Sequence, residues 1–218
     1  MAGNPKNVFL QAFFLTAVIF VFGLLLGVAF EASRIDKVNE YYARSEISLI
    51  DAVALNSLTD LFDSSCEYLV DANIDFANRI YEEAKLLDRY EDAGKIDDNI
   101  KLAHKRYDLL RTFLWINVIK TREKCSEEFS SVVYLYEYES KDLAKRATQN
   151  VWSKVLFDLK KEMGNDIILL SIAANNNIDS LDSLKRKFGI SRLPAVIINE
   201  KYVIQELSSV ESLKRYLV

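Results

Sequence analysis

The pattern of hydrophobic and polar positions begins with one long apolar run. Residues 7–30, NVFLQAFFLTAVIFVFGLLLGVAF, carry no charged side chain and only a few polar ones. A helix of about 20 apolar residues crosses the hydrocarbon core of a membrane, so the run predicts a transmembrane anchor over residues 1–30. The alternative is a cleaved signal peptide, because Gly27, Val28 and Ala29 offer small residues at a cleavage site, although the run is longer than the apolar region of such peptides.

The anchor contains the pattern G-x-x-x-G, formed by Gly23 and Gly27. Small residues four positions apart let two helices approach closely in lipid. The pattern predicts packing of two copies as a homodimer through this helix, and chance occurrence in a glycine-containing span is the alternative. Orientation is weakly marked, since Lys6 precedes the run and Arg34 and Lys37 follow it, and charge alone does not decide it.

Over residues 31–128, apolar positions recur at three- and four-residue steps, which predicts helices. The first is a stalk that continues the membrane helix. Two helices of similar length follow, one after a capping signal at residues 63–65 and one after a turn signal at residues 91–98. A short loop between helices of similar length favours antiparallel packing. We therefore expect a helical hairpin that the stalk completes as a three-helix bundle, with packing like that of a coiled coil.

The period changes near residue 129. Residues 131–139, SVVYLYEYE, are β-branched and aromatic and predict a buried strand. The following pattern predicts, in order, a helix, an apolar strand, a short helix capped by Asp179 or Ser180, a hairpin of two strands, and a terminal helix capped by Ser208 or Ser209. The fold class is therefore α+β, with the order βαβαββα over residues 129–218.

Two cysteines lie at similar distances from the turn of the predicted hairpin. Cys66 precedes Gly94 by about 28 residues and Cys125 follows it by about 31, so a helical rise of about 1.5 Å per residue places both near the open end. This geometry predicts a structural disulfide in an oxidising compartment. Free buried thiols and a redox-active pair are the alternatives. With the anchor, the disulfide predicts a single-pass protein of the cell membrane whose C-terminal domain is extracytoplasmic.

The composition is that of a folded chain without a nucleic-acid partner. Half of the 218 residues are hydrophobic (50%), which is enough for a core. The net charge is −4, and basic residues are scattered among acidic ones instead of forming a patch. We expect the membrane lipid bilayer and an unidentified protein or peptide as partners, and no nucleic acid.

Residues 188–198, FGISRLPAVII, resemble the loop before the third strand in the thioredoxin-like superfamily. With the order βαβαββα, this segment makes residues 129–218 similar to a thioredoxin-like domain. The resemblance implies a cis peptide bond before the proline and a loop that presents backbone groups to an extended peptide. A trans proline at the start of a strand is the alternative. The candidate peptide-binding loop comprises Arg192, Leu193, Pro194 and Ala195. The overall layout also resembles uncharacterised membrane-anchored proteins of archaea.

The chain departs from that superfamily at its catalytic position. The resemblance places a Cys-x-x-C motif at the end of the first strand and the start of the next helix, but residues 136–147, YEYESKDLAKRA, contain no cysteine. Disulfide exchange requires a thiolate, so this chemistry is excluded at that position. Nucleotide-binding, zinc-protease and serine-hydrolase motifs are also missing from the sequence. We interpret His104 as part of a solvated helix face, and we expect no metal and no cofactor.

These features favour a membrane-anchored, redox-inactive thioredoxin-like protein that is not an enzyme and acts as an interaction or scaffolding module. The alternative is a thiol-disulfide oxidoreductase of the cell envelope that uses Cys66 and Cys125. A third hypothesis assigns the function to the helical hairpin alone.

Overall fold

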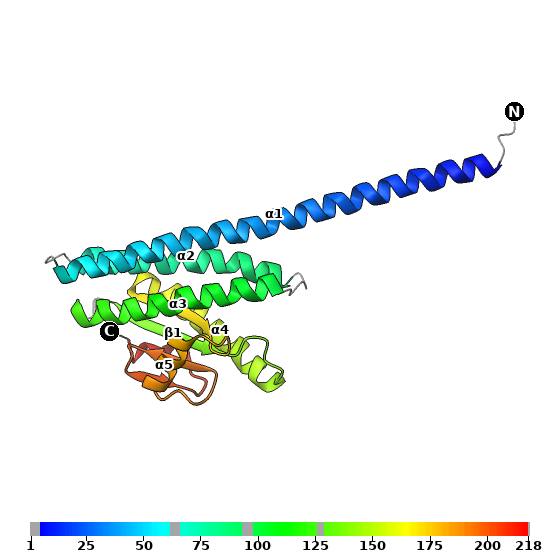
Figure 1. The fold of residues 1–218 in the computed structure, drawn as a ribbon. Coiled ribbons are helices and arrows are strands. Elements are labelled where there is room, and N and C mark those ends of the chain that lie inside the picture. The colour runs from blue at the N-terminus through cyan, green and yellow to red at the C-terminus, as the bar shows by residue number, and fades with distance from the viewer. Residues whose placement is uncertain (1–4, 62–65, 93–97, 126–128, 218) are drawn as a thin grey trace. The chain divides into compact units, whose positions relative to one another are not determined.

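The fold was analysed in a computed structural model that describes residues 5–61, 66–92, 98–125 and 129–217. Helices and one sheet are both present (Figure 1), in agreement with the predicted mixture of the two. The elements are, in order, α1 (Pro5–Leu61), α2 (Cys66–Asp92), α3 (Asp98–Lys124), β1 (Ser130–Tyr136), α4 (Leu143–Met163), η1 (Gly164–Asp166), β2 (Ile167–Ala173), α5 (Asp179–Lys187), β3 (Ala195–Ile198), β4 (Tyr202–Ile204) and α6 (Val210–Lys214). Two compact units result, Met1–Tyr41 and Tyr42–Val218, so the α2–α3 hairpin belongs to the same unit as the sheet.

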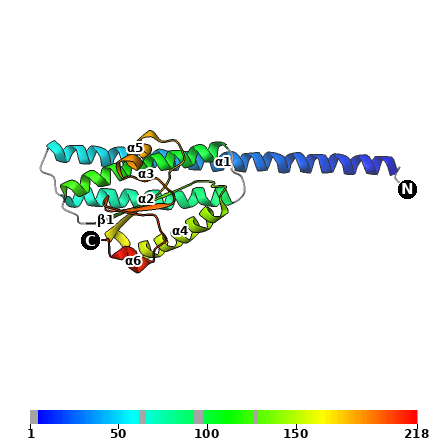
Figure 2. The same cartoon turned by 90° about the horizontal axis from the view of Figure 1, so that it is seen from below.

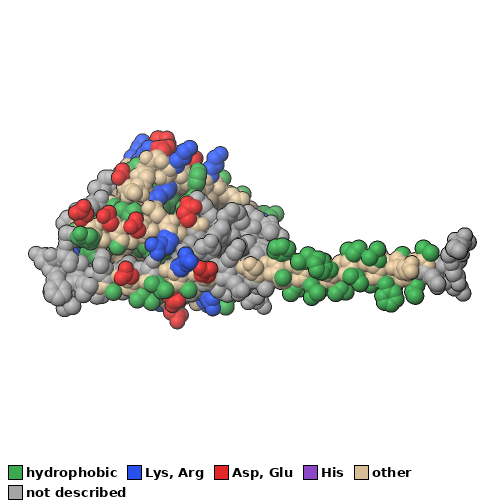
Figure 3. All heavy atoms as spheres, turned by 90° about the horizontal axis from the view of Figure 1, so that it is seen from above, with side chains coloured by type: hydrophobic (Ala, Val, Ile, Leu, Met, Phe, Trp, Pro, Cys, Tyr) green, Lys and Arg blue, Asp and Glu red, His purple; other side chains and the backbone are tan. Residues whose placement is uncertain are grey.

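The first part of α1 carries the apolar run. Its segment Val8–Phe30 is long and apolar enough to cross a membrane, and its large apolar side chains are exposed along the helix (Figure 3). A helix suits this segment because it satisfies every backbone polar group internally, which lipid requires. A signal sequence near the N-terminus also passes this test of length and composition, so the anchor stays a prediction. The helix continues without a break to Leu61, so the residues that follow the apolar run are helical, and their role as a stalk stays a prediction.

The helices α2 and α3 pack against each other as an antiparallel hairpin. Their buried contact residues include Leu69, Phe76 and Ile80 on α2 and Tyr107, Leu114 and Val118 on α3. The predicted capping signal at residues 63–65 lies outside the described residues, and so does most of the predicted turn. The three-helix bundle depends on stalk side chains that are largely outside the described residues, and it stays a prediction.

One sheet of four strands has the order β2-β1-β3-β4. Strand β1 pairs in parallel with β2 and antiparallel with β3, and β4 pairs antiparallel with β3. The strand β1 is buried along nearly its whole length because helices cover both faces of the sheet. The helices α4 and α6 lie on one face, and α3 and α5 lie on the other (Figure 2). The core under α4 and α6 comprises Val132, Tyr134, Trp152, Leu156, Leu159, Ile167, Val196, Ile198 and Leu213.

Local signals at the helix ends were predicted with mixed success. Ser209 is the cap of α6, as predicted, and its hydroxyl accepts from the backbone N–H of Ser212. The predicted cap of α5 was wrong, because Ile178 occupies that position and makes no side-chain cap bond. The first strand ends at Tyr136, earlier than predicted, because the chain turns after it through Glu139, which has a positive φ of 49°.

Candidate functional site

A cavity of about 410 Å³ lies between α4, the α2–α3 hairpin and the adjoining face of β1 and β2. Its size is within the range of pockets that hold small molecules. Four tyrosines contribute to its wall, Tyr81 from α2, Tyr134 and Tyr136 from β1, and Tyr138 from the turn that follows β1. This concentration of tyrosine makes the cavity the first candidate site in the described part of the chain.

The buried pair His104 and Asp108 lies on α3 next to this cavity. The side chain of His104 is 6% exposed and that of Asp108 is fully buried, and Nδ1 of the histidine lies 2.9 Å from Oδ2 of the aspartate. Our interpretation of His104 as part of a solvated face was therefore wrong. The histidine lies within the buried stripe of α3, beside Ala103 and Tyr107, whereas its neighbour Lys105 is exposed.

The carboxylate of Asp108 joins α3 to the edge of the sheet. Its Oδ1 accepts from the backbone N–H of Ala173 at the end of β2 at 3.1 Å, and its Oδ2 accepts from the Asn176 amide at 2.6 Å. Arg111 contributes a further donor at 3.4 Å. A buried charge is stable only when it is paired and hydrogen-bonded, and these donors meet that need. The same contact covers part of the exposed edge that β2 would otherwise present.

The Asp108–His104 pair also orients a tyrosine of the cavity. Because the carboxylate of Asp108 can only accept, the proton of this hydrogen bond is assigned to Nδ1 of the imidazole. The other ring nitrogen, Nε2, forms a hydrogen bond with the hydroxyl of Tyr136 at 3.2 Å. The ring of Tyr138 lies against the imidazole with a centroid distance of 4.0 Å. The arrangement fixes the positions of two of the four tyrosines.

Two titrating groups of the cavity are shifted by burial. Burial lowers the pKa of the Lys160 ammonium, which donates to the backbone oxygens of Gly164 at 2.8 Å and Ile167 at 2.9 Å. Burial raises the pKa of the Tyr134 phenol, so this tyrosine stays protonated at neutral pH. The cavity thus presents the neutral phenol of Tyr134 together with cationic groups at Lys160 and Arg111.

The candidate peptide-binding loop lies at the same end of the sheet as Tyr136. The bond between Leu193 and Pro194 is cis, as the resemblance implied. Arg192 is exposed, Leu193 is partly buried, and Pro194 and Ala195 are buried. Leu135 pairs with Ala195 in the sheet, and the two strands are antiparallel. The loop before Ala195 therefore runs beside the residues that follow Leu135.

The helix α4 follows β1 along the chain and has an aspartate at its N-terminus. The carboxylate of Asp142 accepts from the backbone N–H groups of Ala144 at 2.9 Å and Lys145 at 3.2 Å. These are donors that a helix leaves unsatisfied in its first turn. The N-terminus of α4 is thus capped by a carboxylate.

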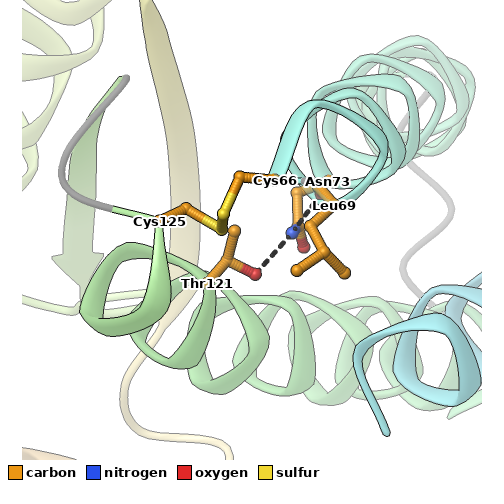
Figure 4. The surroundings of a disulfide bond; sticks show 5 residues. All are labelled: Cys66, Leu69, Asn73, Thr121 and Cys125. Carbon is orange, nitrogen blue, oxygen red and sulfur yellow. Dashed lines mark hydrogen bonds between the residues drawn. A yellow bond between two sulfur atoms is a disulfide. The ribbon is translucent and has the colours of Figure 1, made fainter. Parts of the chain in front are cut away.

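Cys66 and Cys125 form the predicted disulfide at the open end of the hairpin (Figure 4). Their Cα atoms lie 5.4 Å apart. Next to the bond, the Asn73 amide donates to the Thr121 hydroxyl at 2.9 Å and to the Leu69 backbone oxygen at 2.8 Å. These buried hydrogen bonds fix the two helices relative to each other at the covalent link.

The disulfide is remote from the candidate peptide-binding loop. The end of α3 lies at the start of β1, where Arg122 donates to the Ser131 hydroxyl at 3.2 Å, whereas the loop lies at the other end of that strand. At about 3.3 Å per residue, the strand separates these ends by roughly 20 Å. The structure therefore brings neither cysteine to the loop.

The remaining sequence predictions concern packing of the membrane helix at Gly23 and Gly27 and the question of a metal site. A Cβ atom at Gly23 or Gly27 would meet nothing within 4 Å, so this helix face is open, and the homodimer stays a prediction. Among the residues searched in the described ranges, no group of three His, Cys, Asp or Glu side chains could hold a metal ion.

Comparison with known proteins assigns no family. No family model and no curated protein matches the chain. Among solved structures, the chain is similar to one described as "Structure of a malarial protein", with 23% identity over 41% of this chain and 99% of that chain and a TM-score of 0.33. A TM-score this low does not establish a common fold.

Proposed function

We propose that this chain is a single-pass membrane protein whose C-terminal part is a redox-inactive thioredoxin-like module that binds a protein or an extended peptide at the cell envelope. The sheet order β2-β1-β3-β4, with a parallel β1–β2 pair and two antiparallel pairs, supports this class of domain. The cis bond before Pro194 supports it as well. The exposed apolar segment Val8–Phe30 supports the anchor.

The observation that carries the proposal is the aspartate cap at the N-terminus of α4, where the resemblance would place a reactive cysteine. Asp142 holds the first turn of α4, and both cysteines are joined in a bond at the other end of β1. A thiolate at a helix N-terminus is the usual basis of exchange chemistry in such folds. Because Asp142 takes this place at the start of α4, we propose that the candidate peptide-binding loop binds a segment without carrying out disulfide exchange.

The candidate peptide-binding loop has the properties of a preorganised docking surface. The backbone oxygen of Arg192 accepts from the Gln205 amide at 3.0 Å, which ties the loop to the residue after β4. The ring of Pro194 restricts the backbone further. A loop held in one conformation loses little entropy on binding, and an extended segment can pair with its backbone while the exposed Arg192 side chain supplies a positive charge.

A photo-crosslinking experiment tests the binding surface. The full chain, carrying benzoylphenylalanine in place of Arg192, is expressed in membranes and irradiated. Arg186, an exposed residue on α5, is the matched control position. We expect a discrete protein or peptide adduct from position 192 that is missing from position 186. The same adducts at both positions, or none at position 192, would remove the binding role of the loop.

The oxidoreductase alternative makes a different prediction for the cysteine pair. Cys66 is only partly buried, so a reductant could reach the bond from this side, whereas Cys125 is 5% exposed. We expect the full chain to reduce insulin disulfides no faster than a variant with Cys66→Ser and Cys125→Ser, because no thiolate lies beside the loop. The assay follows insulin turbidity with glutathione as electron donor. A rate clearly above that of the variant would favour the enzyme over the binding module.

A further inference from the structure

We propose that the tyrosine-lined cavity binds a small organic anion that carries a planar ring. This site is separate from the candidate peptide-binding loop, and the proposal does not depend on a peptide partner. The cavity of about 410 Å³ is bounded by strands and helices of one compact unit, so its wall exists before any ligand arrives. Preformed concave sites with a few polar groups are the usual form of small-molecule sites.

The aromatic wall suits a planar ring. The rings of Tyr134 and Tyr136 are stacked, with centroids 5.6 Å apart and an interplanar angle of 19°. The Tyr136 hydroxyl is held by His104, and the Tyr138 ring is held against the same imidazole. Tyrosines that are already fixed lose little entropy when a ligand stacks on them, and aromatic pairs add attraction beyond the area that they bury.

The charges of the wall favour an anion. The charged residues among its described lining residues are Arg111 and Lys160, apart from any proton on His104, and no aspartate or glutamate is among them. The Lys160 ammonium donates to two backbone oxygens and has a third N–H. The described contact of Arg111, with Asp108 at 3.4 Å, uses one of its five N–H groups. Both cations therefore retain donors for a carboxylate or a phosphate.

The energetics of Lys160 point in the same direction. Its half-buried ammonium is partly desolvated, which disfavours the charged form and lowers its pKa, and the Asp166 carboxylate opposes only part of this shift. An anion next to Lys160 would oppose this shift, because an opposite charge favours the charged form. Aliphatic and aromatic side chains, Leu156, Leu169 and the exposed Phe157, complete the wall and would contact the apolar part of the ligand.

Matched aromatic probes test the site. Binding of naphthoate, naphthamide and cyclohexanecarboxylate to the full chain in lipid nanodiscs is measured by isothermal titration, and the heat of empty nanodiscs is subtracted. Naphthoate is expected to bind at least about tenfold more tightly than either of the other probes, because only naphthoate combines a planar ring with a charge. No saturable binding of naphthoate, or equal affinity for naphthoate and the neutral amide, would overturn the proposal.

Variants then locate the binding. Lys160→Met is expected to weaken naphthoate binding by about tenfold or more, whereas Lys154→Met, at an exposed position on the same helix, should leave it unchanged. Phe157→Glu places a negative charge at an exposed position of the wall and should also weaken binding by about tenfold. This second variant tests the site even if Lys160→Met fails to fold. Unchanged naphthoate affinity in the folded variants, or in Phe157→Glu alone when Lys160→Met fails to fold, would exclude this cavity.

Discussion

Replacing both cysteines, with Cys66→Ala and Cys125→Ala, is expected to lower the free energy of unfolding by about 4 kcal/mol. The bond joins residues that are 59 positions apart, so it removes many conformations from the unfolded chain. Urea unfolding of the full chain in detergent, followed by tryptophan fluorescence, measures the change. Trp115 and Trp152 suit this readout because both are fully buried.

Reduction of the unmodified chain provides the control for this experiment. If the loss comes from the covalent link, the reduced chain and the double variant should unfold at nearly the same urea concentration. The network of Asn73 and Thr121 is present in both samples and should not distinguish them. A loss below about 1 kcal/mol would contradict the entropic role of the bond and would mean that the unfolded chain is already compact at this point.

The second large effect is expected at Arg122, near the end of α3. Its side chain is 6% exposed, and Nη1 donates to a carboxylate oxygen of Glu200 at 3.2 Å. The same carboxylate accepts from the Trp115 indole at 3.0 Å and from the Ser131 hydroxyl at 2.7 Å. The cluster thus joins α3 to the turn between β3 and β4.

Arg122→Met is expected to lower the free energy of unfolding by about 3 kcal/mol, because it leaves the partly buried Glu200 carboxylate without its countercharge. The matched control is Lys214→Met, which removes an ion pair with Glu162 whose side chains are 38% and 47% exposed. An exposed pair of this kind should contribute less than about 1 kcal/mol. Urea unfolding measures both variants, and equal losses would show that the Arg122 cluster does not stabilise the fold.

The parts of the fold that were predicted correctly depend on short-range regularities. The fixed rise of a helix was enough to place Cys66 beside Cys125, because each helix of the hairpin is one regular element. An uninterrupted apolar run was enough to locate β2, most of whose residues are buried. The cis bond at Pro194 came from a family resemblance and not from physical reasoning.

The candidate cavity could not be predicted because it depends on contacts between distant residues. His104 and Asp108 are four positions apart and follow the apolar stripe of α3, which was a usable signal of burial. Nothing in the local pattern shows that Asp108 meets the N–H of Ala173, 65 residues later. Helical periodicity identifies the buried face of an element, but it does not identify the element that packs on it.

The contact between Asp108 and Ala173 also has a consequence for the order of folding. The α2–α3 hairpin depends on contacts between consecutive helices, whereas the β1–β3 pairing joins Val132 to Ile198 across the whole α4–α5 segment. Local contacts form faster than distant ones, so the hairpin should be complete while the sheet is still assembling. Once the hairpin has formed, the Asp108 carboxylate can accept a hydrogen bond from the backbone N–H of Ala173 in β2. We therefore expect the hairpin to cover the edge of β2 early in folding. An uncovered strand edge can pair with other chains and cause aggregation, so this order of events should protect the folding chain.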